Sequence, residues 1–282
     1  MLTVEAQKQI VNEYFQSTAL FWSEIYTLPS LMGRIHQLRQ ASVLNLVHKL
    51  GLLLGAHALI VGCGAGLEAV ALGRSGYDVQ AIDAVSKMVN LTRRRAAEAG
   101  VQDHVAASVG DVDCLAFRND LFELVLAVGV TPYLLSANAA VREVARVLRP
   151  GGHLIITAEN RWSARQVLDP WLNPVLAPVR NAMRHFLLEC GLRKQPLRRL
   201  RASLYSIRQF DTCLRTAGLS KIEGMTIGFG PFSFFGHRLL PDPAGVVVHN
   251  RLQGLSTQGF PVLRSAGSQY IVLAKKEANI AA

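Results

Sequence analysis

The stretch ALIVGCGAG, residues 58–66, decides the fold of this chain. Its four apolar residues predict a buried strand, its three alternate glycines predict a tight turn, and Leu67–Arg74 follows with a helical pattern. Glycines at a strand-to-helix junction let backbone N–H groups approach a ligand at the positive end of the helix. A turn that only needs positive φ would carry the same glycines, so the stretch requires a second signal.

Asp83 supplies that second signal. It ends the next apolar run, Asp78–Asp83, where a carboxylate can accept hydrogen bonds from both hydroxyls of a ribose. The alternative is an N-cap for the helix predicted from Ser86, although Ser86 itself could serve as that cap. The glycine turn and Asp83 together indicate a ligand with an adenosine moiety. A dinucleotide and S-adenosylmethionine (SAM) both fit, although the spacing G-x-G-x-G departs from the dinucleotide pattern G-x-G-x-x-G.

Short apolar runs alternate with helical patterns from Ala58 to Ala158, which predicts βαβ units and a parallel sheet in an α/β fold. We divide the chain into four parts by this change of pattern. They are an N-terminal helical cap (1–55), a core (56–160), a basic helical insertion or lid without a strand (161–205), and a last part that completes the sheet (206–282) and includes a substrate-side loop (229–268).

Charge is concentrated in one region of the 282 residues. The whole chain has 30 Lys and Arg against 20 Asp and Glu, a net +10. Between Arg161 and Arg215 there are eleven basic and three acidic residues, so 11 − 3 = +8 falls in that region. This predicts an anionic partner for the insertion. Half of the residues are hydrophobic, which excludes a disordered chain.

The four cysteines form no C-x-x-C pair, which favours a reducing compartment and a cytoplasmic location. Charged residues interrupt the N-terminal segment, and Glu123 and Pro132 interrupt the most apolar later run. We therefore predict neither a secretion signal nor a transmembrane span.

Further motifs follow the glycine turn in a fixed order: I-D at 82–83, G-D-V at 110–112, L-A-F at 115–117 and L-R-P-G-G at 148–152. With them, residues 58–158 resemble the class I SAM-dependent methyltransferases, particularly the small-molecule group that includes the ubiquinone- and menaquinone-biosynthesis enzymes. The resemblance implies a Rossmann-like fold with a mostly parallel seven-stranded sheet, helices on both faces and an antiparallel last strand. It also implies SAM as cofactor and methyl transfer by in-line displacement, for which we expect no metal.

The resemblance also assigns cofactor contacts residue by residue. Those near the methionine and ribose are Gly62, Cys63, Gly64, Gly66 and Asp83; those near the adenine are Met88, Asp111 and Val112; and Val128 faces the sulfonium. One position departs from the family. Ile60 stands where members often carry an acidic residue, so we expect compensation from the N-terminal cap, which offers Tyr26, Arg34, His36 and Arg39.

The acceptor side is less defined by sequence. A hydroxyl, phenol or acidic carbon would require a general base, and the candidates are Tyr133, His36, Glu159, His185 and His237. Tyr133, five residues past Val128, is the predicted catalytic residue, with an apolar wall of the pocket as the alternative. The insertion, with Trp162, Trp171, Phe186 and the basic stretch Arg193–Arg201, predicts either a lid over the pocket or a contact with an anionic membrane.

We therefore expect a methyltransferase acting on a bulky, partly hydrophobic or lipid-like acceptor. Two other functions stay open: a nucleic-acid methyltransferase that uses the basic insertion, and a non-catalytic protein with a SAM-binding fold. Nucleic acid is not the partner we expect, because Arg193–Arg201 has little aromatic interleaving and no N-P-P-Y-type turn follows the fourth strand. Calorimetry with SAM and salt-sensitive binding of RNA or DNA would separate the three.

Overall fold

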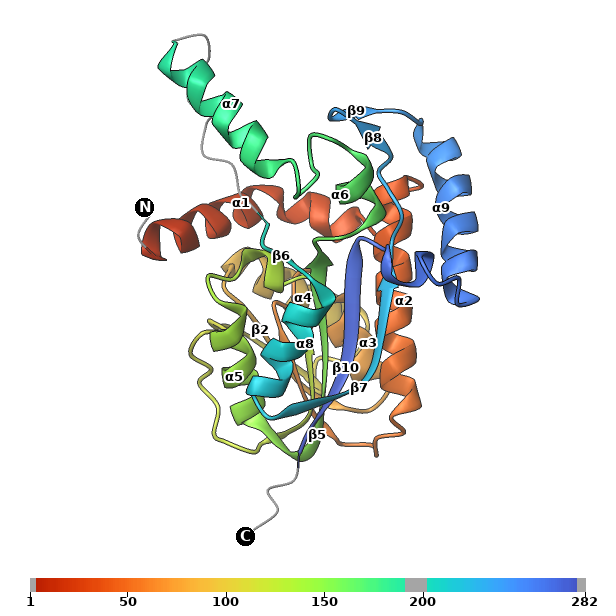
Figure 1. The fold of residues 1–282 in the computed structure, drawn as a ribbon. Coiled ribbons are helices and arrows are strands. Elements are labelled where there is room, and N and C mark those ends of the chain that lie inside the picture. The colour runs from red at the N-terminus through yellow and green to blue at the C-terminus, as the bar shows by residue number, and fades with distance from the viewer. Residues whose placement is uncertain (1–3, 191–201, 278–282) are drawn as a thin grey trace.

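Seven strands form a continuous sheet in the order β3-β2-β1-β4-β5-β10-β7 in the computed structural model, which describes residues 4–190 and 202–277. β1 to β5 pair in parallel, and β10 lies antiparallel between β5 and β7 (Figure 1). The strands of this path are β1 (His57–Val61), β2 (Asp78–Asp83), β3 (Val105–Val109), β4 (Phe122–Ala127), β5 (Leu148–Asn160), β7 (Leu219–Ile227) and β10 (Gln269–Lys276). The predicted Rossmann-like sheet with an antiparallel last strand is confirmed.

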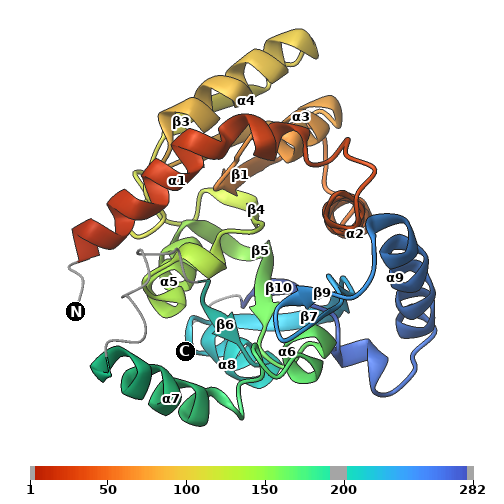
Figure 2. The same cartoon turned by 90° about the horizontal axis from the view of Figure 1, so that it is seen from above.

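Helices cover both faces of this sheet (Figures 1 and 2). One face packs against α2 (Leu31–Lys49), α3 (Leu67–Arg74) and α4 (Ser86–Glu98). The other packs against α5 (Ala137–Val147) and α8 (Ile207–Thr216). The central strands are therefore almost continuously apolar, since successive side chains point into opposite cores.

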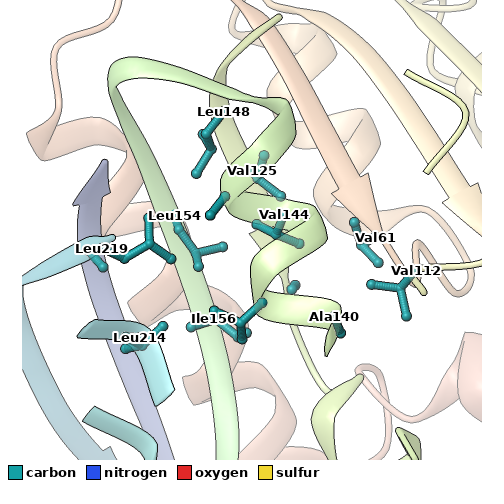
Figure 3. Packing of buried hydrophobic residues seen from close by; sticks show 14 of the residues in the cluster. Val61, Val112, Val125, Ala140, Val144, Leu148, Leu154, Ile156, Leu214 and Leu219 are labelled. Carbon is teal, nitrogen blue, oxygen red and sulfur yellow. The ribbon is translucent and has the colours of Figure 1, made fainter. Parts of the chain in front are cut away.

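The core behind α5 shows how this burial works (Figure 3). Val144 projects from the helix toward Val125 of β4 and Leu154 and Ile156 of β5, and all four side chains are at most 2% exposed. Ile155, between the last two, points into the opposite core. Truncation of Leu154 to alanine would lower the free energy of unfolding by about 2–5 kcal/mol, because the removed methyl groups lose their burial and leave a cavity in the core.

The N-terminal segment forms α1 (Val4–Glu24), which passes over the carboxyl ends of the parallel strands (Figures 1 and 2). Ser30 caps α2 by accepting a hydrogen bond from the Gly33 amide. Among residues 4–190 and 202–277, no helix is long and apolar enough to cross a bilayer.

Two sequence predictions about the last parts of the chain are wrong. The insertion contains α6 (Ala164–Leu168) and α7 (Ala177–Glu189), but it ends in a strand, β6 (Leu204–Tyr205), which pairs in parallel with Glu159 and Asn160. Two residues are too short to show an alternating pattern. Residues 229–268 are not a loop either. They contain β8 (Ser233–Phe234), β9 (His237–Arg238), the 16-residue helix α9 (Asp242–Thr257) and η2 (Leu263–Ser265).

Candidate cofactor and acceptor site

The glycine turn after β1 has left-handed backbone at all three glycines: φ is 68° at Gly62, 53° at Gly64 and 81° at Gly66. A Cβ at Gly64 would meet no protein atom within 4 Å, so this side of the turn is open. A Cβ at Gly66 would instead lie 2.8 Å from the backbone of Thr92. Gly66 does not line the cavity, and close packing against α4 accounts for this glycine in place of the predicted ligand contact.

Asp83 fixes the same turn from the end of β2. Its Oδ2 accepts a hydrogen bond from the Gly64 amide and its Oδ1 one from the Val85 amide, both at 2.9 Å. Burial raises the pKa of this carboxyl, opposed by the two amides. Neither predicted cap is present, because Val85 holds the N-cap position of α4 without a side-chain hydrogen bond. Asp83 thus supports the turn and also lines the cavity.

A cavity of about 580 Å³ opens beside this turn, beneath α1 and at the carboxyl ends of the strands. That size is typical of small-molecule sites. It brings together nine of the ten predicted site residues: Gly62, Cys63, Gly64, Asp83, Met88, Asp111, Val112, Val128 and Tyr133. Cys63 is no nucleophile here, because burial raises the pKa of its thiol to about 12.

Asp111, the predicted adenine partner, already carries an ion pair. Lys8 of α1 places its Nζ 2.6 Å from Asp111 Oδ2 and 2.8 Å from Asp113 Oδ2. Asp111 Oδ1 accepts a hydrogen bond from the Asp113 amide. Lys8 lines the cavity, so α1 is fastened to Asp111 and Asp113 by a contact that sequence reasoning missed.

The end of the cavity expected to hold the methionine moiety contains buried charges with unsatisfied atoms. Arg39 Nη2 donates to the Tyr26 hydroxyl at 2.9 Å, but its Nε has no partner among the described residues. Glu68, in the first turn of α3, is 8% exposed, and its Oε1 also has no partner there. Burial raises the pKa of Glu68, while the charge of Arg39 opposes that shift. Such buried atoms are costly unless a ligand completes them.

Arg39 and Glu68 are charged groups near the position where family members often carry an acid. In this chain that position is Ile60, whose side chain is 3% exposed and packs in an apolar core cluster. Of the four cap residues expected to compensate, the structure brings Tyr26, His36 and Arg39 to the cavity. Arg34 instead donates to Asn250 on α9 at 3.4 Å, outside the cavity. Sequence reasoning missed Glu68. Its signal was a single acid within the apolar start of α3, directly after the glycine turn.

Three of the five candidate bases line the cavity: Tyr133, His36 and Glu159. Burial raises the pKa of Tyr133 to about 12 and lowers that of His36 to about 4. His36 Nδ1 donates to the Met32 carbonyl at 2.9 Å. His237 does not line the cavity. The side chain of His185 lies outside the part of the chain that the structure describes.

The insertion and the β8–β9 hairpin together cover the side of the cavity that Arg165, Leu204 and Arg238 line. We call these two segments the roof. Buried Asp169, which follows α6, joins them because its Oδ2 accepts hydrogen bonds from Ser233 Oγ at 2.6 Å and the Gly236 amide at 3.2 Å. Arg165, Gln166 and Leu204 line the cavity from the insertion.

The aromatic residues of the insertion, predicted on the pocket side or the lipid side, do not reach the cavity. Trp162, Trp171 and Phe186 are 47%, 40% and 61% exposed and none of them lines it, so the pocket side is wrong and the lipid side stays a prediction. The amphipathic pattern could not say which side of the insertion faces inward. The basic stretch Arg193–Arg201 lies outside the described residues. Within residues 4–190 and 202–277, no group of three or more His, Cys, Asp or Glu is placed to hold a metal ion.

Comparison with known proteins identifies the central part of the chain. Residues 59–156 match the family model described as a methyltransferase domain. Over 113 residues the chain is 35% identical to a ubiquinone biosynthesis O-methyltransferase of Xanthomonas oryzae pv. oryzae, covering 40% of this chain and 46% of that protein. The match thus spans about half the length of this curated relative.

Solved structures share the fold over a larger part of the chain. Magnesium protoporphyrin IX methyltransferase from Synechocystis, solved with bound SAH, is 18% identical and aligns with a TM-score of 0.64 over 96% of this chain and 100% of that one. Geranyl diphosphate C-methyltransferase from Streptomyces coelicolor is 19% identical, with a TM-score of 0.57 over 87% and 82%. The resemblance to class I methyltransferases is confirmed in the fold, and residues 59–156 match the methyltransferase domain family.

Proposed function

We propose that this protein is a SAM-dependent methyltransferase that acts on a bulky, partly hydrophobic small molecule or lipid-like acceptor. One observation carries the cofactor assignment. The cavity beside the glycine turn contains a buried guanidinium and a buried carboxylate, Arg39 and Glu68, each with an atom that lacks a partner among the described residues. An α-amino acid end, with one ammonium and one carboxylate, has the complementary charges.

The other contacts follow from the same placement of SAM. Asp83 keeps acceptor capacity for the ribose hydroxyls, and Asp111, once released by Lys8, accepts from the adenine amino group. Val128 and Gly129 follow β4. The Arg39 guanidinium packs closely against Gly129, because a Cβ built on this glycine would lie 3.0 Å from Arg39 Nη1. SAM supplies an electrophilic methyl group on sulfur, and these residues bind and orient it.

Calorimetry with two ligands tests the cofactor assignment. S-adenosylhomocysteine has the amino-acid end, whereas 5′-methylthioadenosine lacks it. Glu68→Gln is expected to weaken S-adenosylhomocysteine binding at least about tenfold, the value of one charge-assisted hydrogen bond, and to leave methylthioadenosine binding unchanged. Equal losses for both ligands, or no loss for either, would contradict the role of Glu68. A wild-type protein that binds neither would contradict the proposed function.

The acceptor class rests on the lining of the acceptor end. Pro132, Tyr133, Leu134, Leu135 and Leu204 give it a mainly apolar wall. The names of similar proteins point the same way, since they include a ubiquinone-biosynthesis O-methyltransferase and enzymes acting on a porphyrin and on a prenyl diphosphate. A methyl acceptor with a large apolar body and one reactive polar atom fits this wall.

We also propose that α7 docks on an anionic membrane surface, on the inner face of a membrane in the cytoplasm. α7 stands away from the sheet in both views (Figures 1 and 2). Val179, Met183 and Phe186 form a stripe at helical spacing and are 69%, 49% and 61% exposed. The surrounding region carries the +8 surplus counted from Arg161 to Arg215, which complements an anionic surface.

Sedimentation with vesicles tests this docking. Wild-type protein is expected to sediment with phosphatidylglycerol vesicles at low salt, and a triple variant with serine at Val179, Met183 and Phe186 to lose most of that binding. A control variant with serine at Leu53 and Leu54, both 83% exposed at a distant turn, should bind normally. Wild-type protein that stays in the supernatant would overturn the membrane proposal and leave the roof as a lid only.

A further inference from the structure

We propose that Glu159 is the general base of this methyltransferase and that the acceptor atom is the oxygen of a weakly acidic hydroxyl, as in a phenol or an enol. This inference rests on the proposed function and specifies its acceptor. Glu159 lies at the carboxyl end of β5, lines the cavity and is half-buried.

The sheet itself orients the Glu159 carboxylate. Gln269, the first residue of β10, lies directly opposite Glu159 in the antiparallel register. Its Nε2 donates to Glu159 Oε1 at 3.2 Å. Because this is the only hydrogen bond of the carboxylate among the described residues, Oε2 keeps its acceptor capacity for a substrate proton.

The groups around Glu159 set the basicity of its carboxylate. Arg39 of α2 and Arg165 of α6 act on it electrostatically, but neither forms an ion pair with it within the described residues. Tyr133 of η1 (Thr131–Tyr133) completes the charged and titratable neighbours. Burial raises the pKa of Glu159, while Arg39, Gln269 and Arg165 oppose the rise. A carboxylate with a raised pKa is a stronger base than an ordinary one.

The two other candidate bases in the cavity are less suited to accept a proton. Tyr133, with a pKa near 12, stays protonated and so cannot take up the substrate proton, and its ring packs edge-on against Phe15 at 4.8 Å. His36, with a pKa near 4, is too weak a base, and one of its nitrogens is occupied by the Met32 carbonyl. The third group to consider, the Glu68 carboxyl, lies in the first turn of α3 directly after the glycine turn, whereas Glu159 lies at the carboxyl end of β5.

The step balances with this assignment. As the acceptor oxygen forms its bond to the methyl carbon, the hydroxyl proton moves to Glu159 and the electron pair of the broken carbon–sulfur bond stays on sulfur. The products are a methyl ether, a neutral thioether and a protonated Glu159, which returns its proton to solvent. A thiol would need no base of this strength, and an amine can lose its proton after transfer.

The test uses SAM labelled with ¹³C in the methyl group and a small-molecule extract of the source cells, because the chemical shift of the product methyl distinguishes oxygen, nitrogen, sulfur and carbon. Wild-type protein is expected to give an O-methyl product. Glu159→Gln is expected to form it about 10²- to 10⁴-fold more slowly, with SAM affinity unchanged. Glu98→Gln, which removes the same charge from an exposed site on α4, should be unaffected.

Two further measurements separate base catalysis from structural support. The wild-type rate should rise with pH through the pKa of Glu159, and formate should partly restore the rate of Glu159→Ala. In unliganded protein with ¹³C-labelled Glu carboxyls, one signal that is missing in Glu159→Gln should titrate above the ordinary range of Glu.

An N-, S- or C-methyl product, or an undiminished rate in Glu159→Gln, would overturn the inference while leaving the methyltransferase assignment in place. A wild-type protein that binds SAM but labels nothing would contradict the proposed function itself, and the inference with it.

Discussion

Replacing Asp83 by asparagine tests whether the glycine turn and β2 form a ribose site. In the structure each carboxylate oxygen accepts one backbone amide at 2.9 Å, from Gly64 and from Val85. Asparagine keeps the shape but presents an NH₂ group to one of these amides. We therefore expect two effects at once: a less rigid turn and a weaker hold on the ribose.

The structure sets the size of both effects. One charge-assisted hydrogen bond contributes about 1.5–3 kcal/mol, so loss of one such bond to the ribose weakens SAM binding roughly 10- to 150-fold. The unpaired amide costs about 1–3 kcal/mol of folding stability. Thr92→Val is the matched control, because Thr92 Oγ1 donates to the Gly64 carbonyl at 3.0 Å and so supports the same turn without a place at the ribose.

Calorimetry with SAM and thermal unfolding of both variants separate the effects. Thr92→Val should lose about 0.5–1.5 kcal/mol of stability and keep its SAM affinity within about threefold. Asp83→Asn should lose both stability and affinity. If the two variants lose equal affinity, Asp83 acts only through the turn. If folded Asp83→Asn binds SAM as tightly as wild type, the ribose assignment is refuted.

Three other predictions address the cap and the roof. Lys8→Gln should bind SAM faster in stopped-flow measurements, because Asp111 is then free of its ion pair. Its free energy of unfolding should change by no more than about 1 kcal/mol, because that ion pair is exposed. An unchanged binding rate would contradict the fastening of α1. His36 has a folded pKa lowered to about 4, so the unfolded chain takes up its proton first and stability falls between pH 6.5 and pH 4, by about 3 kcal/mol. His36→Leu should lose that part of the pH dependence in urea titrations, and an identical profile would disprove it. Asp169→Ala should lose about 1–3 kcal/mol and speed proteolysis of the roof, because it leaves donors such as Ser233 unpaired; unchanged cleavage argues against the joint.

The sheet and the cofactor end could be predicted from the sequence because their signals are local. A strand such as residues 58–61 buries both faces and is apolar throughout. The glycines directly follow this strand, and Asp83 ends the neighbouring strand β2. Gly66 was misassigned because a glycine required by packing against Thr92 has the same sequence signature as one required by a ligand.

The charges around the cofactor could not be predicted, because they meet only through tertiary structure. Lys8 reaches Asp111 across 103 residues, and Gln269 reaches Glu159 across 110. No periodicity links such positions. Helix α9 was missed for a different reason: its three consecutive valines, residues 246–248, and two glycines favour a strand or a turn, and packing against α2 overrides that propensity.

The predicted cofactor residues and the residues around the proposed base lie on different parts of the chain. The methyltransferase match ends at residue 156, and the predicted cofactor residues from Gly62 to Val128 lie inside it. Arg39, Glu159, Arg165 and Gln269 lie outside it. The relatives therefore inform the methyl donor, and the acceptor must be identified from this chain's own side chains. That is why a base variant at Glu159, with the product atom identified, is more informative than further comparison of the shared half.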